Sequence, residues 1–115
     1  MDEEEAADPI LLTSAYDNTI KFWNTTKQTW ECSHTVDLQK KLVVNKMQIS
    51  KDRKHLICAC NIGLRLYQIA NHSDLNLIAH FSYPQNVTAA QASRKFEWII
   101  AASEDGSLRL HDTKL

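Results

Sequence analysis

The chain has 115 residues, of which 43% are hydrophobic and 23% charged, and its formal net charge is -1. This size predicts one domain with a real core, and the balanced charge argues against binding to nucleic acid or to an acidic membrane surface. No apolar run approaches the roughly 18 residues that a membrane span needs.

The N-terminal residues 1–8 are acidic and are predicted to form a flexible, solvated tail. A secretory signal would need a positive region followed by an apolar one, and neither stands here. Cys32, Cys58 and Cys60 make an odd count with no obvious disulfide framework, which favours reduced thiols. We therefore expect a soluble, cytoplasmic protein.

The first predicted unit spans residues 10–36 and contains three strands. A short apolar run at 10–15 ends at the turn signal Asp17-Asn18. A second strand follows at 20–23, and a weaker third strand covers 30–36.

The second predicted unit, residues 43–81, is complete. Its four strands fall at residues 43–49, 56–60, 64–69 and 75–81. A third unit covers 87–112 and stops after its third strand. If the strands of the complete unit are labelled a to d, the chain runs b-c-d, a-b-c-d, a-b-c. No segment has a helical stripe over three turns, so the predicted fold class is all-β.

One eight-residue motif, a tight turn and then a strand that ends in an aromatic residue, occurs three times. It covers residues 17–24, 61–68 and 105–112. The residues that close the strand, Trp23, Tyr67 and His111, are spaced 44 positions apart. A period of this length indicates stacked repeats or a propeller.

The turn followed by an aliphatic residue, a cation, an apolar residue and an aromatic resembles the WD-repeat family. In that family each period forms a four-stranded antiparallel blade. The chain departs from the family pattern because no Trp-Asp pair closes a repeat and no Gly-His pair precedes strand a. The resemblance implies an incomplete β-propeller of about two and a half WD-type blades over residues 9–115.

Residues 8–23 resemble the opening of one group within that family, the WD-repeat subunits of target-of-rapamycin (TOR) kinase complexes. The agreement continues through Val44-Asn45, Ile57-Cys58-Ala59, Leu64-Arg65-Leu66-Tyr67, Asn86-Val87-Thr88 and Ser103-Glu104-Asp105-Gly106. It spans nearly all of this chain but only about the first third of a seven-bladed member with ~40–45 residues per repeat. The resemblance implies a non-catalytic scaffold that docks on the TOR kinase domain and stabilises it, within TOR complexes 1 and 2, in growth and nutrient signalling.

The resemblance also implies where a partner binds, on the end of the propeller built from b–c turns and d–a loops. On this chain that rim would carry Tyr16, Asp17, Asn18, Asn45, Asn61, Glu104 and Asp105. Trp30 is a further candidate, because Trp is enriched in binding hot spots. The alternative interpretation is that Trp30 packs inside its blade. Trp23, Tyr67 and His111 are expected to be structural repeat positions.

No set of residues predicts catalysis or a cofactor. Cys58 and Cys60 share one strand face, but a metal site would need further ligands at suitable spacing, so small core residues are the favoured interpretation. Asp17 and Asp105 are repeat-equivalent turn formers. A nucleophile elbow and a Gly-rich phosphate loop are both absent. We expect no enzyme, no metal and no cofactor.

One stretch of the sequence is rich in cations. It contains Lys40, Lys41, Lys46, Lys51, Arg53 and Lys54. Aromatic residues are not interleaved with them, as a stacking platform for single strands would require. We expect a solvated face, with a partner-facing patch as the alternative.

Two and a half blades are fewer than the 4–8 of a closed propeller. The first and last blades are therefore expected to show broad apolar faces and open edges to water. We favour a truncated product over a ring closed by other copies. The alternative function is that of a self-associating or truncated WD-repeat fragment, which serves as a structural adaptor in another assembly.

Overall fold

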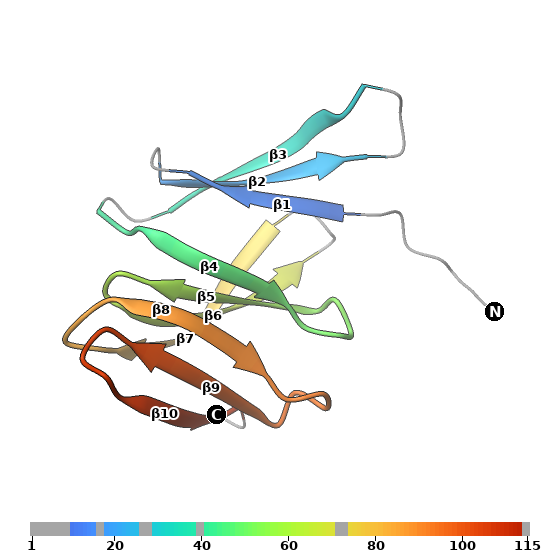
Figure 1. The fold of residues 1–115 in the computed structure, drawn as a ribbon. Helices are drawn as coiled ribbons and strands as arrows, with labels where there is room; N and C mark the ends of the chain where they lie inside the picture. The colour runs from blue at the N-terminus through green and yellow to red at the C-terminus, as the bar shows by residue number, and fades with distance from the viewer. Residues whose placement is uncertain (1–9, 16–17, 26–28, 39–40, 71–73, 114–115) are drawn as a thin grey trace.

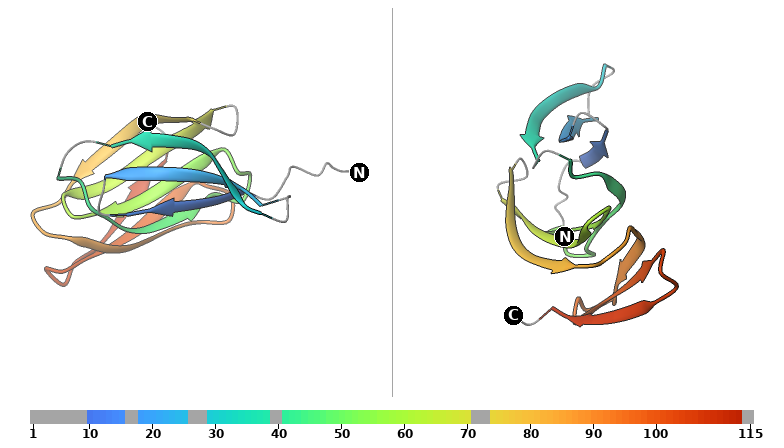
Figure 2. Two further views of the ribbon diagram at one scale, coloured as in Figure 1. Left: turned by 90° about the horizontal axis from the view of Figure 1, so that it is seen from above. Right: turned by 90° about the vertical axis from the view of Figure 1, so that its left-hand side faces the viewer.

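The protein is described by a computed structural model that covers residues 10–15, 18–25, 29–38, 41–70 and 74–113. In these residues ten strands form three antiparallel sheets. No helix occurs among them, and so none that could cross a membrane. The sheets stack face to face in chain order (Figure 1), which the two turned views also show (Figure 2). The predicted all-β partial propeller is confirmed, while the predicted tail over 1–8 lies outside the described residues.

The sheets contain three, four and three strands, as the order b-c-d, a-b-c-d, a-b-c requires. The first sheet consists of β1 (Ile10–Ser14), β2 (Thr19–Asn24) and β3 (Glu31–Asp37). The middle sheet consists of β4 (Val44–Ile49), β5 (His55–Cys60), β6 (Gly63–Ala70) and β7 (Asp74–Ser82). The last sheet consists of β8 (Val87–Ala92), β9 (Trp98–Ser103) and β10 (Leu108–Asp112).

The strand registers carry the sequence repeat into three dimensions. In each sheet the residue that closes the motif lies opposite an aliphatic residue of strand b. The pairs are Trp23 with Leu11, Tyr67 with Leu56, and His111 with Ile99. Equivalent residues of the three repeats therefore point to the same side of their sheets.

Strand β5 lies at the centre of the stack and is buried on both faces. Leu56, Cys58 and Cys60 belong to the core shared with the first sheet, and Ile57 and Ala59 to the core shared with the last. Because neither face meets water, the alternation of apolar and polar residues is lost and the strand reads as one apolar run.

The middle sheet is held by two separate cores, one on each side. On one side Leu56 and Tyr67 pack with Ile20 and Phe22 of β2. On the other side Leu66 belongs to a cluster that includes Val87, Ile99 and Ala101 of the last sheet. Both cores depend on side chains that lie far apart in the sequence.

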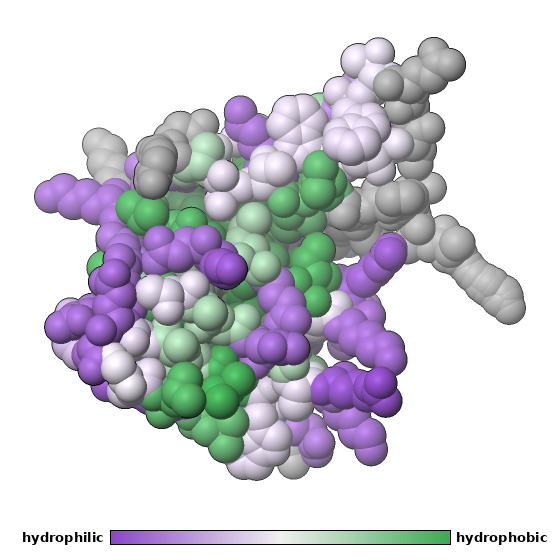
Figure 3. Space-filling model, in the orientation of Figure 1, coloured by the Kyte–Doolittle hydropathy of each residue, from purple (hydrophilic) through white to green (hydrophobic). Residues whose placement is uncertain are grey.

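Among the described side chains, only those of the last sheet form the broad apolar outer face that was expected of both end sheets. Figure 3 shows hydrophobic side chains gathered over β9 and β10, and the large exposed ones are Trp98, Ile100, Leu108 and Leu110. The outer face of the first sheet instead carries Thr13 and Lys21 beside Leu11 and Trp23. Trp23 Nε1 donates a 2.9 Å hydrogen bond to Thr13 Oγ1, so even its aromatic ring is tied to a polar neighbour. The expectation for the first blade was therefore wrong.

Leu66 and Leu110 stand one repeat apart and offer a matched pair of substitutions. Leu66 is 1% exposed and Leu110 is 63% exposed. We expect Leu66→Ala to lower the free energy of unfolding by about 2–5 kcal/mol, since it leaves a cavity. Leu110→Ala should change it by no more than about 0.5 kcal/mol. Urea unfolding at low protein concentration measures both, and equal losses would contradict the asymmetry of the two faces.

Candidate protein-binding rim

The turns between strands b and c and the linkers between strands d and a lie together at one end of the sheets. In the middle sheet, the Asn61 amide donates to the Val43 carbonyl oxygen at 2.9 Å. The last sheet repeats this bond, from the Glu104 amide to the Asn86 carbonyl oxygen, also at 2.9 Å. We call this end the rim; it comprises residues 18, 38, 41–45, 61–62, 83–86 and 103–107.

Each linker also bonds back to the turn of the sheet that it leaves. The Leu38 amide donates to the Asn18 carbonyl oxygen at 2.7 Å, and the Tyr83 amide to the Ile62 carbonyl oxygen at 3.2 Å. Turns and linkers therefore form a continuous hydrogen-bonded band, and the rim is a preorganised surface rather than a set of independent loops.

Asn18 has a structural role within the rim. Its φ of 64° lies in the left-handed region, as does that of its repeat equivalent Gly106 at 87°. Asn tolerates this conformation better than most residues. Its Nδ2 donates to the Leu42 carbonyl oxygen at 2.6 Å and so ties the first turn to the linker that enters β4.

Asn61 also uses its side-chain amide for hydrogen bonds within the chain. Its Oδ1 accepts a hydrogen bond from the Val43 amide, and its Nδ2 donates to the Lys41 carbonyl oxygen, both at 2.9 Å. These two bonds hold the linker before β4 against the turn between β5 and β6.

Asn45, near the start of β4, makes the corresponding link to the last sheet. Its Nδ2 donates to Asn86 Oδ1 at 3.0 Å and to the Val87 carbonyl oxygen at 2.8 Å. All three predicted asparagines are therefore brought to the rim. The amides of Asn18 and Asn45 each reach toward the following sheet, whereas that of Asn61 holds the linker that enters its own sheet.

Glu104 and Asp105 are the exposed acidic residues of this group. The Asp105 carboxylate accepts hydrogen bonds from Ser107, at 2.6 Å from its Oγ and 2.9 Å from its amide. These bonds lower the pKa of Asp105, and they make it the turn former that the sequence indicates. The Glu104 side chain is exposed on the same turn. Tyr16 and Asp17 lie outside the described residues.

The sequence reasoning missed several exposed rim residues. Ile62 is 38% exposed although it is aliphatic, and Pro84 and Gln85 are exposed on the linker before β8. For Ile62 a signal was present, because an aliphatic residue inside a two-residue turn between buried strands has no core to enter.

Trp30 does not lie with the other predicted residues. It immediately precedes β3, whose first residue, Glu31, pairs with Asn24 at the end of β2 that is farthest from Asn18. Its side chain is 57% exposed. The structure therefore places this aromatic at the end of the first sheet opposite the rim.

Two of the structural repeat positions differ in how they satisfy their polar atom. Trp23 uses the bond to Thr13 on the outer face of the first sheet. Tyr67 is 4% exposed, and its hydroxyl accepts a 3.3 Å hydrogen bond from Arg65 Nη1. Burial raises the pKa of Tyr67, and the bond from Arg65 opposes that rise.

His111, the third repeat position, joins the last sheet to the middle one. Its ring stacks on Phe81 of β7, with 4.2 Å between ring centroids, and its Nε2 shares a hydrogen bond with the Tyr83 hydroxyl. The guanidinium carbon of Arg109 lies over the Tyr83 ring, 4.5 Å from the ring centroid. Burial and the charge of Arg109 lower the pKa of His111, so the neutral imidazole is favoured in this interface.

The thiols of Cys58 and Cys60 are buried in the core on the same face of β5. Burial raises the pKa of Cys60 to about 11 and that of Cys58 well above its usual value. Both are protonated at neutral pH and act as small core residues. Within the described residues, no group of three or more His, Cys, Asp or Glu side chains gathers as a metal site.

The predicted basic stretch is spread along the length of the middle sheet, with Lys46 exposed on β4 between the two ends. Lys41 lies on the rim, while Lys51, Arg53 and Lys54 lie in the turn between β4 and β5 at the opposite end. Lys40 lies outside the described residues. The cations near this stretch of sequence therefore do not form one surface.

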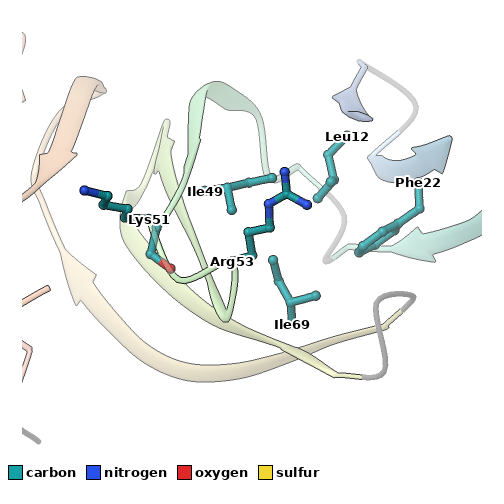
Figure 4. A pocket seen from close by; sticks show the side chains of 7 residues that line it. Leu12, Phe22, Ile49, Lys51, Arg53 and Ile69 are labelled. Atoms are coloured by element: carbon teal, nitrogen blue, oxygen red, sulfur yellow. The ribbon is translucent and has the colours of Figure 1, made fainter. Parts of the chain in front are cut away.

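A pocket of about 260 Å³ opens beside that turn, between the first and middle sheets. Figure 4 shows its lining, with Arg53 extended toward Leu12 and with Phe22, Ile49 and Ile69 around it. Its walls are the margin of the core between these two sheets, so the pocket belongs to their packing.

Comparison with known proteins places the sequence in a family. The sequence matches the family described as WD domain, G-beta repeat over residues 6–24 and 66–112. It is 31% identical to the target of rapamycin complex subunit LST8-1 of Arabidopsis thaliana over 91% of this chain and 33% of that protein. It is 34% identical to the target of rapamycin complex subunit wat1 of Schizosaccharomyces pombe over 91% of this chain and 32% of that protein. It is 33% identical to the target of rapamycin complex subunit LST8 of Saccharomyces cerevisiae over 91% of this chain and 34% of that protein. The chain thus spans about a third of the length of these relatives.

Substitution of Asn18 separates its two contributions to the rim. Asn18→Gly keeps access to the positive φ and loses the bond to Leu42, which should cost about 1 kcal/mol. Asn18→Ala loses the bond and also places an unassisted Cβ in the left-handed region, so we expect a larger loss of about 2–3 kcal/mol. Denaturant unfolding of the two variants measures the difference. If Ala were tolerated better than Gly, the backbone argument would fail.

Acidification should destabilise the fold. Burial, and then a neighbouring arginine, lowers the pKa of both His80 and His111. The unfolded chain, with histidine pKa values near 6.5, therefore binds protons that the folded chain does not. The free energy of unfolding that is present above about pH 6.5 is therefore lost as the pH falls through the lowered pKa values of these two histidines in the folded chain.

Urea unfolding at about pH 7.5 and about pH 5.5 measures this loss. His111→Phe keeps a ring on Phe81 and removes one titrating group, so its loss of stability between the two pH values should be smaller. An equal loss in this variant would show that the pKa of His111 does not contribute.

Proposed function

This chain belongs to the WD domain, G-beta repeat family, and we propose that it acts as a non-catalytic, protein-binding subunit of a TOR-type kinase complex. The observation that carries the proposal is the similarity of 91% of the chain to proteins named as target of rapamycin complex subunits. The chain spans about a third of the length of those proteins. That it shares the role of a whole complex subunit is therefore proposed.

The proposed docking surface is the rim, which would bind the catalytic domain of the kinase and stabilise it. Its hydrogen-bonded band supports this role, because a rigid surface loses little conformational entropy on binding. Glu104 and Asp105 supply exposed acidic groups, and Ile62 supplies an apolar one. This combination suits a kinase surface that offers a basic residue beside an apolar patch.

A non-catalytic role is consistent with the state of the reactive side chains. The Asp105 carboxylate is held by Ser107, and the Cys58 and Cys60 thiols are buried and protonated. Free thiols also suit the reducing cytoplasm, where we propose that the protein works.

Co-precipitation with a TOR-type kinase domain tests the proposal. We expect the chain to retain the kinase domain, and Glu104→Lys to weaken the complex by about three- to tenfold because it reverses an exposed rim charge. Glu97→Lys is the matched control, since Glu97 is exposed on the same sheet at the opposite end, in the turn between β8 and β9. If the unmodified chain did not co-precipitate the kinase domain, the proposal would be overturned.

Trp30 provides a second comparison that locates the surface. If Trp30→Ala abolished binding while Glu104→Lys did not, the docking surface would lie at the end opposite the rim. We expect Trp30→Ala to leave the affinity within about twofold, because truncation of a residue outside an interface is nearly neutral.

A further inference from the structure

Two turns at the end of the sheets opposite the rim have the same backbone structure. One joins β4 to β5 over residues 50–55, and the other joins β8 to β9 over residues 93–98. In each turn the amide of the first residue donates to the carbonyl oxygen of the last, at 2.9 Å and 2.8 Å. The fourth residue of each has a positive φ, 63° at Arg53 and 56° at Phe96. The turns are therefore repeat equivalents that can be compared residue by residue.

The β4–β5 turn contains a carboxylate that binds its own serine. Ser50 Oγ donates to Asp52 Oδ1, and the Lys54 amide donates to the same oxygen at 2.9 Å. Ser50 Oγ also accepts a 3.1 Å hydrogen bond from the His55 amide. Partial burial acts to raise the pKa of Asp52, but the two bonds and the neighbouring positive charges together lower it. The hydroxyl of this serine is thus satisfied by an anion from within the turn.

The β8–β9 turn lacks that anion, because Lys95 stands where the other turn has Asp52. Ser93 Oγ accepts hydrogen bonds from the Glu97 and Trp98 amides, at 3.0 Å and 3.1 Å. Among the described residues, nothing accepts a hydrogen bond from the Ser93 hydroxyl. This turn therefore has the donor of the serine–carboxylate pair without its acceptor.

Cations lie around the unmatched serine. Lys51 and Arg94 line a depression of about 380 Å³ between the two turns, and Gln91 and Ser93 line it with them. Lys95 is exposed on the same turn as Arg94. Within the part of the chain that the structure describes, no carboxylate forms an ion pair with any of these three cations. We call this site the basic groove; it comprises residues 51, 91 and 93–95.

The basic groove is a local concentration of charge on a nearly neutral chain. Residues 50–55 and 93–98 contain five lysine and arginine residues but two carboxylates, whereas the whole chain has a net charge of -1. Figure 1 shows the two turns at the same end of the sheets, and Figure 3 shows hydrophilic side chains projecting there. Lys51 extends away from Arg53 (Figure 4), so it does not enter the pocket between the first and middle sheets. Such a surface attracts anions, although the chain as a whole does not.

Contacts between the sheets hold the two turns together. The His55 ring stacks on Phe96, with 4.3 Å between ring centroids and 14° between the ring planes. Gln48 Oε1 accepts a 2.9 Å hydrogen bond from the Ala92 amide. Both sheets belong to the described residues, and the turns lie at strand ends rather than on a sheet face. The basic groove therefore does not depend on a further sheet on either side.

We propose that the basic groove binds an acidic segment of a partner protein. One carboxylate of that segment accepts from the Ser93 hydroxyl, as the Asp52 carboxylate accepts from Ser50 in the equivalent turn. Neighbouring acidic residues of the segment lie along Lys51 and Arg94. Nucleic acid fits the groove less well, because no aromatic side chain lines it for base stacking.

This site is separate from the surface proposed for the kinase. The rim and the basic groove lie at opposite ends of the same strands, so one partner can occupy each. Binding of an acidic segment and binding of a kinase domain are therefore independent, and either can fail without the other.

Fluorescence anisotropy with the full chain and a labelled acidic peptide tests the proposal. The probe is a peptide of alternating glutamate and serine, and the control peptide has glutamine in place of glutamate. We expect the glutamate peptide to bind at about 50 mM salt and to bind more weakly at about 300 mM, because salt screens exposed charges. The glutamine peptide should not bind.

Single charge reversals locate the site. Lys51→Glu and Arg94→Glu should each weaken binding of the glutamate peptide by about fivefold or more, because each replaces an attraction with a repulsion. Lys41→Glu makes the same charge change at the rim and should leave the affinity within about twofold. All three residues are exposed, so the fold should survive, which thermal unfolding checks.

A second pair of variants tests the role of the serine. Lys95→Asp gives the β8–β9 turn the carboxylate that Asp52 gives the other turn, so Ser93 is satisfied within the chain. Lys54→Asp makes the same charge change on the β4–β5 turn, where the acceptor is already present. We expect Lys95→Asp to weaken binding about fivefold more than Lys54→Asp, because the peptide also loses a hydrogen bond.

Any of four results would overturn the proposal. The glutamate peptide could fail to bind at the lower salt concentration, or Lys41→Glu could weaken it as much as Lys51→Glu. Equal losses in Lys95→Asp and Lys54→Asp would show that the Ser93 hydroxyl takes no part. Tighter binding of a labelled thymidine oligonucleotide, with the same sensitivity to Lys51→Glu, would make the groove a nucleic-acid site instead.

Discussion

Face-to-face burial of β-sheets is the constraint on which the rest of this structure depends. A sheet can be apolar on both sides only when a neighbour covers each side, and β5 meets this condition in the middle of the stack. Its side chains alternate between two cores, with Leu56 and Cys58 on one side and Ile57 and Ala59 on the other. Among the described residues, the first and last sheets are covered on one side only, and this difference separates Leu66 from its repeat equivalent Leu110.

The rim follows from the same stacking. Once the sheets are packed, the turn of one sheet lies beside the linker that enters the next, and the backbone groups of both must be satisfied there. Asn18, Asn61 and Asn45 supply amides that donate to those linker carbonyls or accept from their amides. The residues that resemble a partner-binding set thus also build the surface, and the groups left open to a partner are Glu104, Asp105 and Ile62.

The strands were predictable from the sequence because each is bounded by a turn signal and repeats at a constant interval. The grouping of residues into surfaces was less predictable. Trp30 appeared as a rim candidate, but the direction in which β3 runs places it at the opposite end. The cations from Lys41 to Lys54 are neighbours in sequence, yet β4 spreads them from one end of the sheet to the other. The first sheet was expected to be apolar outside, but Thr13 and Lys21 face outward there.

By itself, the sequence determined the repeat of 44 residues, the all-β class and the order of strands, because turn residues and alternating side chains are local properties. The WD-repeat family followed from the resemblance of the repeated motif. Only the tertiary structure decided which copy of each repeated residue is covered. Ile20, Leu64 and Leu108 are equivalent in sequence, but burial depends on the sheet that lies opposite. No local pattern records whether such a sheet is present. The same physical reason explains why the asparagine contacts of the rim and the exposed leucines of the last sheet emerged only from the packed sheets.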